Sequence, residues 1–141
     1  MRGFHIAGLA AVALVFAASA ASAASPEKEA AGWAKWVDFN QGILDANDQQ
    51  SLAPLNQACK GVTGMMVAQG FQFPYWAQQS MMLCQGVGDV AKGNRKAACK
   101  TLKAVSKELA KAKPVEIEPR AEPIARQLKE IADGALSVNR C

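Results

Sequence analysis

Histidine is almost absent from this sequence, and that absence limits the chemistry expected of it. The one histidine is His5. Imidazole is the usual acid or base near neutral pH and the usual activator of a serine or cysteine nucleophile. There is also no phosphate-binding glycine loop after a strand and no GxSxG, HExxH or CxxCH motif. Asp38, Asp45 and Asp48 are not spaced to meet in one cleft. We therefore expect no catalytic residues, no cofactor and no enzymatic activity.

Long hydrophobic runs are also missing, apart from one near the start. Ile6–Ala18 is apolar over 13 residues, fewer than the roughly 20 needed to span a bilayer. It follows one positive charge and precedes Ala21-Ser22-Ala23, the pattern of a signal peptide with its cleavage site, and Ala18-Ser19-Ala20 is a second option. We expect residues 1–23 to be removed, together with His5, which would leave 24–141 as one domain. The pattern predicts a periplasmic or secreted protein whose mature chain has no transmembrane span.

Cysteine is scarce but even in number. The four cysteines are Cys59, Cys84, Cys99 and Cys141, separated by 25, 15 and 42 positions. These separations match no zinc motif, so we expect no metal site. In an exported chain of this size the cysteines are expected to form two disulfides. Partners across a helical hairpin lie equidistant from its turn. The midpoint between Cys59 and Cys84 is position 71.5, and the midpoint between Cys99 and Cys141 is position 120. Both midpoints fall in expected connections between helices, and we favour this pairing. The alternative pairing, Cys84 with Cys99 and Cys59 with Cys141, remains open because the midpoint between Cys84 and Cys99, position 91.5, also falls in a turn.

Strand signals are nearly absent, whereas apolar residues recur at helical spacing. Ser25-Pro26-Glu27 has the residues of a helix start, and Asn94 is a second expected N-cap. The second predicted helix would bury a stripe of Leu52, Leu55, Cys59, Val62 and Met66. Helices are predicted over residues 25–46, 52–68, 74–91, 95–113 and 123–137. The predicted fold is all-α, a compact up-down bundle of four to five helices stapled by two disulfides.

Glycine is frequent inside these predicted helices, where each costs about 0.5–1 kcal/mol relative to alanine. Two interpretations remain open: close approach between helices, or local flexibility around a binding groove. The positions concerned are Gly32, Gly42, Gly61, Gly64, Gly86 and Gly88.

Positive charge is concentrated in one segment. Residues 92–113 have a net charge of +7, against −3 for residues 24–91 and −1 for residues 114–141. At 3.6 residues per turn the lysines share one face within about 100°. The face is either simply solvated or a contact surface for an acidic protein or an anionic envelope surface. We expect no nucleic-acid partner. The lysines are Lys96, Lys100, Lys103, Lys107 and Lys111, with Lys92 at the start of the row.

Aromatic residues gather around Pro74, namely Phe71, Phe73, Tyr75 and Trp76. One interpretation is that they cover the apolar end of the bundle. The other is that they anchor a partner, since aromatic side chains dominate interface energetics.

These features predict an exported, non-enzymatic interaction protein, an inhibitor or immunity-type binder of an envelope enzyme or toxin that acts by covering its functional cleft. The alternative is a carrier that holds a small apolar ligand between helices. The identity of the partner and the oligomeric state do not follow from the sequence.

Overall fold

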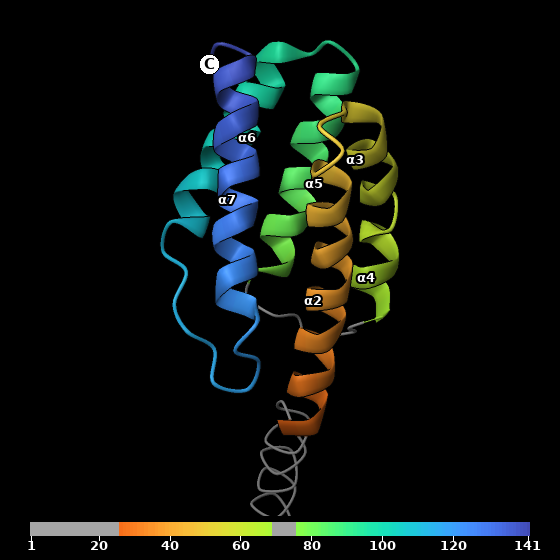
Figure 1. The fold of residues 1–141 in the computed structure, drawn as a ribbon, viewed down its shortest axis with the longest axis vertical. Helices are drawn as coiled ribbons and strands as arrows, with labels where there is room; N and C mark the ends of the chain where they lie inside the picture. Colours follow the sequence, from red (N-terminus) through yellow and green to blue (C-terminus); the bar gives the residue numbers. More distant parts are fainter. Residues whose placement is uncertain (1–25, 69–75) are drawn as a thin grey trace, which may run out of the picture.

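The computed structural model describes residues 26–68 and 76–141, and all regular structure within these ranges is helical (Figure 1). This confirms the predicted all-α class. The expected signal peptide lies outside the described residues. The helices are α2 (Pro26–Asn47), α3 (Leu52–Cys59), α4 (Val62–Ala68), α5 (Ala77–Ala91), α6 (Arg95–Leu109) and α7 (Ala121–Val138).

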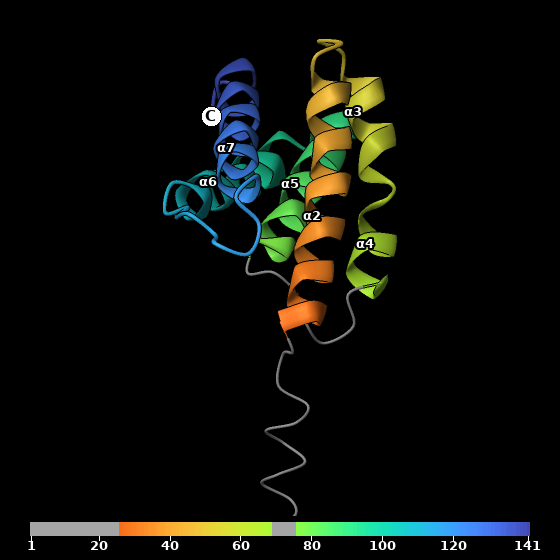
Figure 2. The same cartoon turned by 60° about the horizontal axis from the view of Figure 1, so that its bottom comes forward.

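The helices pack as a closed ring around one core. Along this ring α2 contacts α3, α3 contacts α5, α5 contacts α6, α6 contacts α7, and α7 returns to α2. In Figures 1 and 2, α5 lies in the middle. Helices α6 and α7 lie on one side of it, and helices α2, α3 and α4 lie on the other side. No described helix has the length and apolar content of a membrane-crossing segment.

The second predicted helix is in fact two helices. The chain leaves the α-helical pattern at Lys60 and Gly61, whose N–H groups donate to Gln57 O and Ala58 O, three residues back. This tighter turn shifts the helical phase, so Met65 is buried in α4. The Met66 side chain lies outside the described residues.

Within α3 the expected stripe is only partly correct. Leu55 and Cys59 are buried, but Leu52 is 40% exposed. Leu52 is the first residue of α3 and follows the turn from α2, so its side chain lies at the edge of the core.

Other helix ends also differ from the prediction. α5 begins at Ala77 instead of 74, and Trp76 lies in the turn before it. α6 ends at Leu109 instead of 113, because the N–H groups of Lys111 and Ala112 already donate three residues back, to Glu108 O and Leu109 O. α7 begins at Ala121, before Pro123. Proline is tolerated there because the first turn of a helix has N–H groups without helical partners.

The turn between α5 and α6 contains the expected N-cap Asn94 and, before it, a glycine with positive φ. Gly93 adopts φ +76°, and the N–H groups of Gly93 and Asn94 donate to Val90 O and Asp89 O at 3.0 and 2.8 Å, a Schellman closure of α5. The Asn94 side chain then accepts from Ala97 N at 3.4 Å as the N-cap of α6. This turn makes α5 and α6 antiparallel neighbours.

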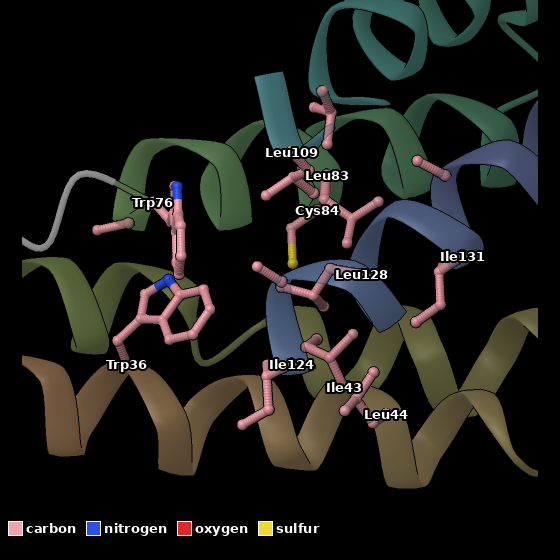
Figure 3. Close-up of a cluster of buried hydrophobic side chains, with 14 of the residues drawn as sticks. Trp36, Ile43, Leu44, Trp76, Leu83, Cys84, Leu109, Ile124, Leu128 and Ile131 are labelled. Carbon is pink, nitrogen blue, oxygen red and sulfur yellow. The ribbon is translucent and has the colours of Figure 1, made fainter. Parts of the chain in front are cut away.

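The core contains one cluster of tryptophans and one buried polar pair. The ring centroid of Trp33 lies 5.6 Å from that of Trp36 and 5.4 Å from that of Trp76, both edge to face. Next to them, Asn40 donates to Trp36 O at 2.7 Å and accepts from the Ser80 hydroxyl at 2.8 Å, joining α2 to α5. Apolar side chains from all six described helices fill the rest of the interior, and Figure 3 shows part of this cluster.

The two disulfides have the favoured pairing, and the alternative pairing is wrong. Cys59 is bonded to Cys84, with Cα atoms 5.2 Å apart, and Cys99 to Cys141, with Cα atoms 5.5 Å apart. The first lies in the core, whereas Cys141 is exposed. The chain end is held further by Arg95, which donates to the carbonyls of Asn139 and Arg140 at 2.5 Å each.

Candidate interaction surface and adjoining grooves

The predicted lysine face forms one exposed surface, which we call the lysine surface and define as Lys96, Lys100, Lys103, Lys107 and Lys111. All five side chains are exposed. The opposite side of α6 is buried against α5 and α7 through Ala98, Leu102, Val105 and Leu109. The apolar stripe thus fixes the direction in which the lysines project. The first four lie in α6, and Lys111 lies in the turn after it.

The charges of this surface are weakly compensated. Lys111 pairs with Glu108, with Nζ 3.2 Å from Oε1. Within the described part of the chain, the other four lysines have no carboxylate oxygen within ion-pair distance. Like charges three or four residues apart on a helix repel by about 0.2–0.5 kcal/mol per pair. The protein therefore holds a row of cations that an external anion would stabilise.

A tight carboxylate site lies beside α6, at Asp133 of α7. Lys129 Nζ donates to its Oδ2 at 2.5 Å, and the Ser106 hydroxyl of α6 donates to its Oδ1. The Lys129 hydrogen bond first, and then that from Ser106, hold the pKa of Asp133 below its ordinary value of 3.8. Asp133 thereby ties α7 to α6 and does not neutralise the lysine surface.

Most of the aromatic segment cannot be placed, because Phe71, Phe73 and Tyr75 lie outside the described residues. Trp76 is only 5% exposed and packs against Trp33 and Trp36. Its indole is therefore part of the core and does not project as an anchor for a partner.

An apolar groove that sequence reasoning missed lies at the end of the bundle that holds the α2–α3 turn and the C-terminus of α7. Its volume is about 390 Å³. Polar side chains of Asn47, Gln50, Ser51, Glu130 and Asn139 border it. The wrong assignment of Leu52 to the core hid this feature, since Leu52 is part of the wall. Its apolar wall is formed by Leu52, Leu55, Val90, Ile131, Ala135 and Val138.

A smaller polar cleft of about 220 Å³ adjoins this groove, between α2 and α7. The two share Asn47, Glu130 and Ile131 as lining residues. The cleft contains a second carboxylate, Asp48. No lysine, arginine or residue of α6 is among the described residues lining either space, so both are separate from the lysine surface.

The remaining acidic candidates do not form a site of their own. Asp38 and Asp45 are exposed on α2, and Asp45 accepts a hydrogen bond from Gln41 at 3.0 Å. In the described ranges no three metal-ligating side chains of His, Cys, Asp or Glu come together.

The chain matches no protein-family model, no curated protein and no solved structure. A proposal for its function can therefore rest only on the fold, the lysine surface and the apolar groove described above.

Proposed function

We propose that the protein is an exported, non-enzymatic binder that inhibits an envelope enzyme or toxin by covering an acidic surface at its functional cleft. The observation that carries this proposal is the lysine surface: five exposed cations on one face, of which only Lys111 has an ion pair within the described residues.

The rigid setting of α6 supports binding by a preformed surface. α6 packs on α5 and α7 along its whole buried face, and Cys99 links it to the chain end. Little backbone order has to be gained on binding, so less of the interaction energy is lost to entropy. A row of like charges also accelerates encounter with an acidic partner, and this effect decreases with ionic strength.

Export is part of the same proposal. The signal-peptide pattern predicts it, and the two disulfides are of the kind that persist in oxidising compartments. An envelope or extracellular partner follows from that compartment.

The test is capture of a partner by immobilised mature protein from an envelope extract. Reversing the charge of Lys100, Lys103 and Lys107 to glutamate should abolish capture, because it replaces three cations by three anions at the centre of the surface. The matched control reverses Lys28, Lys35 and Lys60, which lie on α2 and after α3 and give the same change in net charge.

We expect the wild type and the control to capture the same acidic protein, less of it at high salt, and to inhibit its activity once it is isolated. Equal capture by the Lys100, Lys103 and Lys107 variant, with its circular dichroism unchanged, would exclude the lysine surface as the binding site.

A second candidate function, a carrier of a small ligand, is favoured by the apolar groove between α3 and α7. The ligand of such a carrier would lie in this surface groove at one end of the bundle. Native mass spectrometry of protein purified from its host distinguishes the two functions, since a carrier should retain a small molecule.

A further inference from the structure

The apolar groove and the polar cleft form one continuous concave region. They meet at Asn47, Glu130 and Ile131, which line both. Two of the four exposed large apolar side chains among the described residues lie at the groove end of this region, Leu52 at 40% and Val138 at 83%. A groove of about 390 Å³ is within the size range of small-molecule sites, which are mostly apolar with a few placed polar groups.

The charge of this region is of one sign. Asp48 and Glu130 are its ionisable lining residues, and neither has an ion-pair partner among the described residues. Arg95 is held by the carbonyls of Asn139 and Arg140. Lys129, the neighbour of Glu130 in sequence, is held by Asp133. The two carboxylates therefore give the region a negative potential next to an apolar wall.

We propose that this region is a binding site for a small organic cation with an apolar tail. The tail lies along Leu52, Leu55 and Ala135 between α3 and α7, and the cationic group lies at Glu130, with Asp48 beyond it. The proposal deepens the carrier function and is independent of the lysine surface.

A second copy of the chain fits this region less well. A two-fold contact places the same patch on both copies, so it would bring Asp48 and Glu130 of both protomers into one interface. Four like charges in one interface disfavour association. A small cation has the complementary charge.

The first experiment compares three probes that share an octyl tail: octyltrimethylammonium, octyl glucoside and octyl sulfate. Binding to the mature, disulfide-bonded protein is measured by calorimetry at low ionic strength, below the micelle concentration of each probe. Affinity should decrease from the cation to the neutral glucoside to the anion. Amide chemical shifts should change first at Gly134, Ala135 and Val138.

Two substitutions separate the charge from the apolar wall. Glu130→Gln should weaken binding of the cation about two- to fivefold, as for an exposed ion pair, and leave octyl glucoside unchanged. The control Glu116→Gln removes the same charge from the exposed α6–α7 connection, outside the region, and should have little effect.

Gly134→Phe should block the groove and reduce binding of all three probes about tenfold or more, since it occupies the space of the tail. Gly134 is an exposed residue that lines the groove, and an added Cβ there meets no atom within 4 Å. Circular dichroism checks that the variant is folded. Gly134→Ala is the matched control and should retain binding.

Two results would overturn the site: octyl sulfate binding as tightly as the cation, or unchanged binding by Gly134→Phe. Native mass spectrometry tests the carrier function separately. Probe binding without a co-purified ligand supports the site and counts against the carrier function.

Discussion

The close contact between α5 and α6 at Gly86 leads to a prediction about the stability of alanine variants. A Cβ added to Gly86 would lie 2.7 Å from Leu102 Cδ2 and 2.8 Å from Leu102 Cγ, well inside van der Waals contact. Leu102 is fully buried, so its side chain has little room to move away. Gly88, in the same helix, has nothing within 4 Å of the corresponding position. The same substitution to alanine should therefore have opposite effects at the two positions.

The expected magnitudes follow from two effects. In a helix, alanine is more favourable than glycine by about 0.5–1 kcal/mol. Forcing an extra carbon into a packed core costs about 1–3 kcal/mol. Gly88→Ala should therefore stabilise the protein by about 0.5–1 kcal/mol, whereas at Gly86 the middle of the clash cost less the helix gain gives a net destabilisation of about 1 kcal/mol.

Urea unfolding monitored by circular dichroism measures both variants against the wild type. The double variant Gly86→Ala/Leu102→Ala provides the control, since removing the Leu102 side chain also removes the clash. The decrease in the free energy of unfolding of the double variant should be smaller than the sum of the decreases of the two single variants by about 1 kcal/mol or more. If Gly86→Ala is as stable as the wild type, the close packing of α5 on α6 is not the reason for glycine at this position.

The remaining predictions concern single contacts. Because its pKa is lowered in the folded protein, Asp133 stabilises the fold above pH 3.8 and loses this effect as pH falls below that value. Asp133→Asn should therefore lower the free energy of unfolding at neutral pH, and acid unfolding should show a smaller loss of stability on acidification than in the wild type. Mild reductant should open Cys99–Cys141 before the disulfide in the core, because Cys141 is exposed. Mass spectrometry after alkylation should find the thiols of Cys99 and Cys141 labelled first, and earlier labelling of the core pair would refute this order. Asn40→Ala should cost about 1–3 kcal/mol in urea unfolding, since it removes the nearer acceptor of the buried Ser80 hydroxyl and leaves only Trp76 O at 3.4 Å. A double variant with Ser80→Ala should recover part of the loss.

Several features of this protein follow from the sequence alone because they depend on neighbours in the chain. The spacing of Ala98, Leu102, Val105 and Leu109 fixed both the buried side of α6 and the exposed side that holds the lysine surface. Asn94 marked the start of α6. The same local information reduced the disulfide pairing to two options and favoured the observed one, but only the tertiary structure decided between them.

Other features were decided only by tertiary structure. The sequence predicted one helix from 52 to 68 with Leu52 buried, but the chain turns at Lys60 and Leu52 lies beside a groove. The sequence also left two reasons for the helical glycines open, and at Gly86 the structure shows close helix approach. The groove and the cleft join side chains from α2, α3, α5 and α7, which are far apart in the chain. Helical periodicity says which residues face inward, but the space left between helices depends on how their side chains fit together.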